Sequence, residues 1–309
     1  MSASRQYLDH LPAIALRIYK CSSLEGIVKT VVEDVQRLLN VDRALIYRFQ
    51  ANCGGKIIAE SVQDGSCSIQ DLDKKNVCFN DHLIHPYWQG GIRAIEQVET
   101  SDIEPHHKAM LKQLQVQSKL VIPIFYTAQI KLPFALPTND GDETSSSEQL
   151  WGLLILHQCS NVRHWNHLEI SLLRQLVVHM AIAMQKAKVQ VFSSWLLESS
   201  MDGIMAFDRD GRYIVWNQAM EQIFGISQAE ALGQRAFDLF PFLQETGENI
   251  FFKAALDGET SVAKDRPYRV PQSGREGFFE AYYCPLMEDF GEIIGGMAVV
   301  RDITARKQA

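Results

Sequence analysis

The sequence lacks the features of nucleic-acid-binding, membrane and secreted proteins. Its formal net charge is −7, and no run of Lys and Arg supplies the basic surface that nucleic-acid binding requires. No apolar stretch approaches the roughly 18 residues of a membrane-spanning helix, and the N-terminus has no apolar core of signal-peptide length. We therefore expect a cytoplasmic protein with neither a nucleic-acid partner nor a membrane segment.

Paired cysteines are also missing. The six cysteines are scattered and form no Cys-x-x-Cys pair, which favours reduced thiols over a disulfide framework. Cys78, His82 and His85 have side chains that can bind zinc, but their spacing is not that of a zinc finger and no fourth ligand is evident. We expect no metal site.

Catalytic signatures are absent as well. The sequence has no Gly-x-x-x-x-Gly-Lys-Ser/Thr phosphate loop, no Gly-x-Ser-x-Gly elbow and no His-Glu-x-x-His motif. It has neither a Gly-Gly-Asp-Glu-Phe cyclase signature nor the Gly-rich nucleotide boxes of a histidine kinase. These absences predict a protein that is not an enzyme.

The length and composition that are present suit two globular domains. A chain of 309 residues exceeds one ordinary domain, and 46% hydrophobic with 22% charged residues is a globular composition. We place the first domain at residues 1–190, a connecting helix at 166–199 and the second domain at 195–309. Each domain is expected to be α+β, built on an antiparallel sheet.

The first half of the chain alternates between helical and strand patterns. Ser22 followed three residues later by Glu25 is a capping box, which opens a helix. Residues 138–148 contain no apolar side chain, so we expect a solvated, mobile loop there. Period-two and apolar runs predict strands at Arg43–Phe49, Lys56–Val62, Lys119–Tyr126 and Trp151–His157.

A long helix is predicted over residues 166–199, capped at its start by Asn166. Its apolar positions are spaced alternately three and four residues apart, which is a heptad seam and favours a partner helix in a homodimer. The alternative is that its first turns pack on the first domain while the rest is a spacer. The seam comprises Ile170, Leu173, Val177, Met180, Met184, Ala187 and Val191.

The second half of the chain begins with a strand hairpin and ends with three strands. Asn217 follows the hairpin and is predicted to cap a short helix. Further short helical segments separate the hairpin from the last strands. The strand candidates are Gly203–Asp208, Tyr213–Trp216, Ser261–Val270, Gly277–Met287 and Ile293–Arg301.

This order of elements resembles a PAS sensor domain. The motifs that carry the resemblance are Asp208-Arg-Asp-Gly211, Trp216-Asn217 and the terminal Arg301-Asp302-Ile303-Thr304. The resemblance implies that Asp302 and Thr304 relay a signal from the last strand. Only residues 305–309 follow, so we expect the output to pass to a separate kinase, cyclase or response regulator.

Neither a haem nor a flavin is expected in this second domain. The chain has no histidine beyond His179, which excludes a His-ligated haem. The flavin-thiol light sensors of the same superfamily need an Asn-Cys-Arg-Phe-Leu-Gln stretch, and the sequence has none.

Residues 20–190 resemble a GAF domain of the kind found in phytochromes and cyanobacterial bilin photoreceptors. The matching segments are Arg43–Phe49, Val116–Ile124, Leu150–Gln158 and Trp165–Ile170. In that family a linear tetrapyrrole is bonded to a Cys immediately before a His, and this chain has His106-His107 at that place. The attachment cysteine is therefore replaced by His106.

The resemblance implies a set of candidate chromophore contacts. His107 keeps the position of the ring-contacting histidine, His157 the one near the far pyrrole, and Tyr47 lies in a matching strand. Some members carry a second cysteine in an Asp-x-Cys-Phe motif, and Cys78 occupies that place with Asn76 for Asp. A phycocyanobilin-like pigment bonded to Cys78, one held noncovalently, and a pocket that is empty or holds another ligand all stay open.

We therefore expect a sensor whose first domain responds to a small ligand or light and whose second domain relays the signal. The alternatives are a ligand-free interaction scaffold and the sensor fragment of a histidine kinase that acts with a separate catalytic partner.

Overall fold

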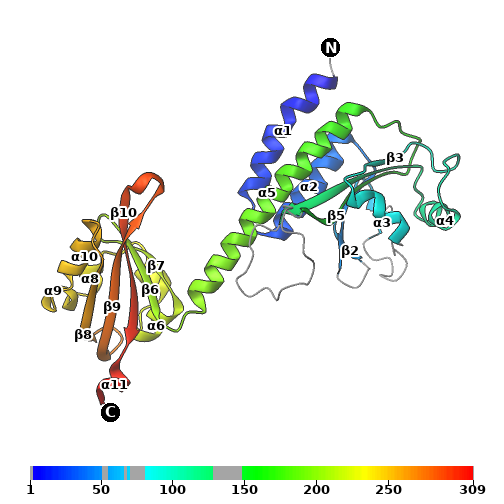
Figure 1. Cartoon of the computed structure of the whole chain (residues 1–309). Helices are drawn as coiled ribbons and strands as arrows, with labels where there is room; N and C mark the ends of the chain where they lie inside the picture. Colours follow the sequence, from blue (N-terminus) through cyan, green and yellow to red (C-terminus); the bar gives the residue numbers. More distant parts are fainter. Residues whose placement is uncertain (1–2, 51–54, 66–67, 70–80, 128–147, 309) are drawn as a thin grey trace, which may run out of the picture. The chain divides into compact units, whose positions relative to one another are not determined.

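The computed structural model describes residues 3–50, 55–65, 68–69, 81–127 and 148–308. Cys78 and residues 138–147 of the expected loop lie outside the described residues. The chain divides into two compact units, Met1–Gln190 and Val191–Ala309. Each unit is built on its own five-stranded sheet in which all paired strands are antiparallel (Figure 1). The expectation of two α+β domains with antiparallel sheets is confirmed.

The first unit has helices on both faces of its sheet, whose strand order is β2-β1-β5-β4-β3 (Figure 1). One face is covered by α1, α2 and α5, while α3 and α4 lie on the side of the other face. The strands are β1 Arg43–Phe49, β2 Gly55–Val62, β3 Arg93–Ile95, β4 Ser118–Thr127 and β5 Glu148–Gln158. The helices are α1 Ala3–Lys20, α2 Leu24–Leu39, α3 Asp81–Trp88, α4 Pro105–Gln113 and α5 His167–Glu198.

The alternation of side chains along the strands divides them between two cores. Even-numbered residues such as Ala44, Leu120 and Leu156 pack against the helices α1, α2 and α5. Odd-numbered residues such as Leu45 and Ile155 face the opposite side, where they pack with Tyr87 of α3. We call this second side the odd face. Because both faces are buried, these strands are nearly continuous apolar runs rather than strict alternations.

The cap of α2 is one residue from its predicted place. Ser23, not Ser22, occupies the cap, and its Oγ accepts the Gly26 N–H at 3.1 Å. The helix ends at Asn40 in the left-handed region, with φ 49°. An asparagine tolerates this conformation better than most residues, which suits it to a helix terminus.

The heptad seam of α5 has a different role from the one predicted. Leu173, Met180 and Met184 are buried in the core of the first unit, together with the α1 and α2 side chains. The same core contains Val177 and Ala187 of the seam, whereas Val191 is exposed. Packing within the unit therefore explains most of the seam, as in the alternative stated above, so the seam does not support a partner helix and the homodimer stays a prediction. A period of 3.5 residues does not distinguish a domain core from a partner helix.

The second unit orders its strands β7-β6-β10-β9-β8 and places its short helices on one face (Figure 1). The strands are β6 Gly203–Asp208, β7 Tyr213–Trp216, β8 Ser261–Val270, β9 Arg275–Met287 and β10 Ile293–Asp302. The helices are α6 Gln218–Phe224, α7 Gln228–Ala231, α8 Ala236–Leu239, α9 Phe242–Glu245, α10 Asn249–Leu256, the 3-10 turn Asp289–Gly291 and α11 Thr304–Gln308.

The core of this unit is filled by its own aromatic side chains. Trp216 is fully buried and stacks on Phe240 at a ring distance of 5.7 Å, while Phe224 and Tyr213 pack on the same pair. Within the described residues these side chains line a cavity of about 10 Å³, which is room for one water molecule.

Asn217 does more than cap α6. Its Oδ1 accepts the N–H of Met220 at 3.1 Å, which is the predicted cap, and that of Ile204 at 2.8 Å. Its Nδ2 donates to the carbonyls of Leu197 and Asp202 at 2.9 and 3.2 Å. One buried amide therefore joins the start of α6 to β6 and to the segment that precedes β6.

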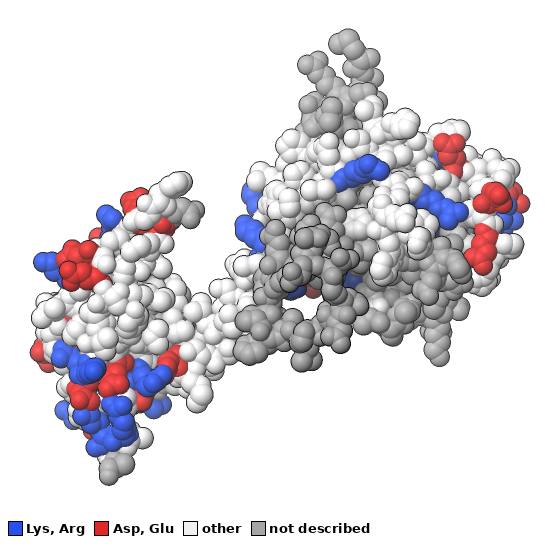
Figure 2. All heavy atoms as spheres, viewed as in Figure 1, with Lys and Arg blue, Asp and Glu red and all other residues white. Residues whose placement is uncertain are grey.

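Charged side chains of both signs are mixed on the visible surface of the second unit (Figure 2). Around α11, for example, Arg306 pairs with Glu280 at 2.6 Å and Lys307 with Asp265 at 2.8 Å. Over the ranges that the structure describes, no helix has both the length and the apolar content to cross a bilayer.

Candidate functional site

Three basic side chains cross the sheet of the first unit in one straight line. Arg43 of β1 pairs with His157 of β5, and His157 pairs with Lys119 of β4. Directly paired residues of neighbouring strands point to the same face, so all three lie on the odd face. Each of the three is at most 3% exposed. We call Arg43, His157 and Lys119 the basic row.

Helix α4 places a fourth basic side chain on the row. His107 is buried, and its Nε2 lies 3.3 Å from Nζ of Lys119. Nη1 of Arg43 lies 3.1 Å from Nδ1 of His157. The two contacts join α4, β4, β5 and β1 at one end of the odd face.

Burial sets the charge of these groups. It lowers the pKa of His107 to about 4, with Lys119, Arg93 and His106 adding repulsion. It lowers the pKa of His157 well below the usual value, with Lys119, Arg43 and His107 adding repulsion. Burial, helped by Arg93, brings the pKa of Lys119 to about 7. At neutral pH both imidazoles are therefore uncharged and Lys119 is close to half protonated.

Two imidazole nitrogens of the site lack a hydrogen-bond partner in the part of the chain that the structure describes. Among the described residues, Nδ1 of His107 and Nε2 of His157 are buried without a hydrogen bond. A guanidinium only donates, so Nδ1 of His157 must accept from Arg43, and the proton of the neutral ring is on Nε2. If the Lys119 amine donates to Nε2 of His107, that ring likewise carries its proton on Nδ1. In this arrangement the odd face presents two N–H groups that have no acceptor among the described residues.

Glu60 of β2 holds the far end of the basic row. Its Oε1 lies 3.5 Å from Nε of Arg43 and accepts the Ile69 N–H at 3.0 Å, while its Oε2 accepts the Ser68 hydroxyl at 2.6 Å. The carboxylate therefore fixes the guanidinium and also ties the 68–69 segment to the odd face.

An apolar floor adjoins the row. Tyr47 is 1% exposed and packs edge to face on Phe49 at 5.5 Å. Gly55 of β2 leaves room for the Tyr47 ring, because a Cβ at that position would overlap it. Burial raises the pKa of Tyr87 to about 12, so its hydroxyl stays protonated. The remaining floor residues are Leu45, Ile69, Val121, Leu153 and Ile155.

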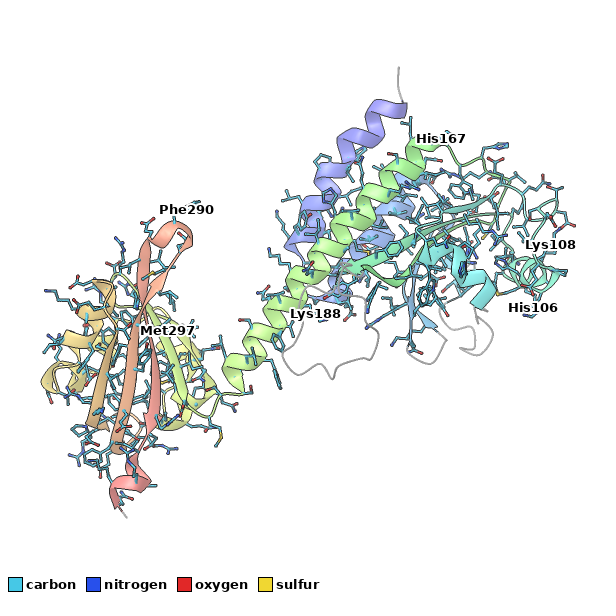
Figure 3. The ribbon with its side chains drawn as sticks, viewed as in Figure 1. His106, Lys108, His167, Lys188, Phe290 and Met297 are labelled. Atoms are coloured by element: carbon cyan, nitrogen blue, oxygen red, sulfur yellow. The ribbon has the colours of Figure 1, made fainter. Side chains whose placement is uncertain are left out.

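The structure thus brings together three of the candidate contacts, His107, His157 and Tyr47, on one face. His106 is exposed on α4 and takes no part in the basic row (Figure 3). Cys78 lies outside the described residues. Sequence reasoning missed Lys119, Arg43 and Glu60. For Arg43 and Lys119, the signal that could have found them is a charged residue at the same strand parity as the odd-face residues Leu45 and Val121. Glu60 lacks this signal, because a register shift between β1 and β2 changes the parity along β2.

No metal centre accompanies the site in the part of the chain that is described, where no group of three His, Cys, Asp or Glu side chains could bind an ion. Of the sequence candidates, His85 is exposed on α3, and the side chains of Cys78 and His82 are outside the description.

The candidate relay residues of the second unit lie where β10 meets α11. Oδ1 of Asp302 accepts the Thr304 N–H at 2.7 Å, and Oγ1 of Thr304 accepts the Phe278 N–H of β9 at 3.0 Å. Just before them, Arg301 makes two hydrogen bonds to Asp202, at 3.0 and 2.7 Å, and these lower the pKa of that carboxyl. The pair Asp302 and Thr304 therefore anchors α11 to the sheet.

Comparison with known protein families agrees with this division of the chain. The family model described as GAF domain matches residues 23–184. The chain belongs to the GAF domain family. A second model, described as PAS fold, matches residues 197–308, so a GAF unit is followed by a PAS unit.

Curated relatives of the chain include a putative chemotaxis protein and several histidine kinases. A putative methyl-accepting chemotaxis protein of Synechocystis is 29% identical over 60% of this chain and 16% of its own length. The circadian input-output histidine kinase CikA of Synechococcus elongatus is 24% identical over 57% of this chain and 23% of its own length. The chain thus spans less than a quarter of either relative.

Solved structures with a similar fold include bilin-bound GAF domains. The GAF domain of the cyanobacteriochrome TePixJ is 27% identical, covers 56% of this chain and 95% of that one, and has a TM-score of 0.46. A phycocyanobilin-bound GAF domain of a cyanobacterial phytochrome is 22% identical, covers 60% and 96%, and has a TM-score of 0.48.

Proposed function

We propose that this protein is a cytoplasmic, non-catalytic sensor whose GAF unit binds a small ligand on the odd face. The two buried N–H groups of His107 and His157, which lack partners among the described residues, carry this proposal. A buried polar group without a hydrogen bond costs on the order of 1–3 kcal/mol, which a ligand acceptor would offset. The relatives support a role in signal transduction, since they include histidine kinases and a putative chemotaxis protein.

The ligand class that suits these residues best is a linear tetrapyrrole held without a thioether at residue 106. Its lactam carbonyls and carboxylates are the acceptors that two N–H donors need, and the basic row supplies charge for a carboxylate. The apolar floor around Tyr47 and Tyr87 suits its conjugated rings. When bound, such a group supplies absorption of visible light.

In this proposal each residue has a limited role. His157 and His107 donate to the ligand, and Arg43 holds the His157 ring in the donating tautomer. Glu60 holds Arg43 in turn. His106, which is exposed, does not anchor the ligand.

The experiment is co-expression with phycocyanobilin synthesis, followed by absorption spectra before and after acid denaturation. A visible band that leaves the denatured chain, and is weakened in His157→Ala, supports a noncovalent pigment. A band that stays on the denatured chain and is lost in Cys78→Ala would instead indicate a thioether at Cys78. If the purified protein has no band, this pigment is not the ligand.

The PAS unit would pass the state of the GAF unit to a partner. We propose a histidine kinase as that partner, because histidine kinases recur among the curated relatives of the chain. The anchoring of α11 by Asp302 and Thr304 provides the structural element on which a partner would act.

A further inference from the structure

Lys119 is a lysine inside a sheet, and the proposed ligand contacts do not use its amine as a nucleophile. Lysines usually bury their carbon stem and keep the amine in water. Here the residue is 2% exposed, and its amine lies on the odd face at 3.3 Å from Nε2 of His107. An imidazole at that distance can take a proton from the amine and return it.

Burial, helped by the charge of Arg93 on β3, favours the neutral form of the amine. The other titratable or charged side chains near it are His107 of α4, His157 of β5 and, next in the same row, Arg43 of β1. With a pKa of about 7, half of the amine is unprotonated at pH 7, whereas a lysine in water with a pKa near 10.4 is unprotonated in only about one molecule in 2,500. The neutral amine is the nucleophilic form of lysine.

We propose that Lys119 forms a reversible imine with a ligand that carries an aldehyde or ketone together with a carboxylate or phosphate. The proposal rests on the proposed function, because it takes the odd face as the ligand site. The N–H groups of His107 and His157 would bind the carbonyl oxygen or the anionic group of that ligand. Arg43 and Arg93 favour the anion by their charge.

The reaction needs no oxidant or reductant. The amine nitrogen of Lys119 attacks the carbonyl carbon, and the carbonyl oxygen gains a proton to give a carbinolamine. Nε2 of His107 takes the remaining amine proton and returns it to the hydroxyl, which leaves as water. One C=N bond replaces one C=O bond, and hydrolysis reverses the step, as a sensor of changing ligand levels requires.

Glyoxylate, the smallest aldehyde that carries a carboxylate, is the probe. The native full chain is incubated with glyoxylate and cyanoborohydride at pH 7, and the reduced adducts are located by peptide mass spectrometry. We expect Lys119 to be modified at least tenfold faster than Lys186, which is exposed on α5. Modification of Lys119 at or below the rate of Lys186 in the folded chain would overturn the proposal.

Variants separate the nucleophile from its surroundings. Lys119→Arg keeps the positive charge but cannot form an imine, so its peptide should stay unmodified, whereas Lys186→Arg should leave labelling of Lys119 unchanged. His107→Gln should slow labelling, because the proton carrier is lost. If His107→Gln instead leaves the rate of Lys119 unchanged, the imidazole has no part in the reaction and the mechanism is wrong.

Loading with phycocyanobilin distinguishes this inference from the proposed function. A pigment on the odd face should protect Lys119 from glyoxylate. Visible absorption without trapping of Lys119 in the unloaded chain would refute the imine and leave the pigment site standing. Rapid trapping of Lys119 without any visible absorption of the loaded protein would support the imine and rule out the tetrapyrrole as the ligand.

Discussion

His157 lies directly across the sheet from Arg43, and its Nδ1 is 3.1 Å from Nη1 of the guanidinium. Because the guanidinium can only donate, this contact places the proton of the neutral ring on Nε2. The neighbouring strand thus determines which atom His157 offers to a ligand. Glu60 on the next strand fixes Arg43, so three strands share in orienting one imidazole.

The first prediction concerns that tautomer. Nitrogen-15 NMR of the unloaded protein should show His157 neutral and protonated at Nε2 at pH 8 and still so at pH 6.5, because burial lowers its pKa well below the usual range. Arg43→Met should allow the other tautomer, while Arg37→Met, at an exposed position of α2, should not. A His157 ring that becomes doubly protonated near pH 6.5 would contradict the assignment.

The second prediction is a loss of stability on acidification. His107 has a pKa of about 4 in the folded chain and near 6.5 when unfolded, so the unfolded chain binds more protons between these values. The stabilisation of the folded state that neutral His107 provides is therefore fully present above pH 6.5 and is lost as the pH falls toward 4. The melting temperature of the GAF transition should fall more between pH 7 and pH 5 in the wild type than in His107→Gln. An equal fall in melting temperature in the two proteins would show that His107 does not cause the loss of stability.

The resemblance to bilin-binding GAF domains made part of this site predictable, but the strand register was not predictable. The sequence identified the strands, and the resemblance gave His107 and His157 as candidates. Arg43 and Lys119 were not identified as site residues, because the sequence does not show that residues 43, 119 and 157 pair with one another across three strands. The sequence also did not show that His106 lies outside the site. Successive residues of a helix point about 100° apart, so His107 is buried against the sheet while His106 is exposed to solvent.

The α5 seam shows a second limit of the sequence. Residues such as Met180 and Met184 have the same spacing whether they face a partner helix or their own domain. Only the positions of α1 and α2 decide between the two, and these depend on contacts with residues far away in sequence.

The third prediction concerns a buried carboxylate of the PAS unit. Glu248 is fully buried before α10, pairs with Arg266 and accepts the Tyr283 hydroxyl at 3.0 Å. Glu248→Ala removes the acceptor of the buried Tyr283 hydroxyl and the carboxylate partner of Arg266, which keeps its bond to the Thr246 carbonyl. We therefore expect the free energy of unfolding of this unit to fall by about 3–5 kcal/mol. Urea denaturation followed by circular dichroism measures it, with exposed Glu259→Ala as the control. A change equal to that of the control would contradict the prediction.

The fourth prediction tests the anchoring of α11. Thr304→Val removes the acceptor of the Phe278 N–H, and Asp302→Ala removes the acceptor of the Thr304 N–H. Both changes should increase hydrogen exchange of the amides in α11, and Lys307, which bonds to the Ile303 carbonyl, reports it. Arg269→Gln, which disrupts an exposed ion pair on β8, should leave this exchange unchanged. Unaltered hydrogen exchange in both variants would show that Asp302 and Thr304 do not anchor α11, and would refute their proposed role in the relay.

The fifth prediction replaces the seam with a different surface for self-association. Val178, Ile182 and Val189 of α5 are each at least 44% exposed, and spacings of four and seven residues put them on one face of the helix, away from the buried seam. We propose that two copies of the chain pair through this face, since burying such side chains is worth about 1.5–3 kcal/mol each. Ile182→Glu should therefore shift the sedimentation coefficient from dimer to monomer, whereas Lys29→Glu, at an exposed position of α2, should retain the dimer. A wild-type chain that sediments as a monomer at micromolar concentration would refute the pairing.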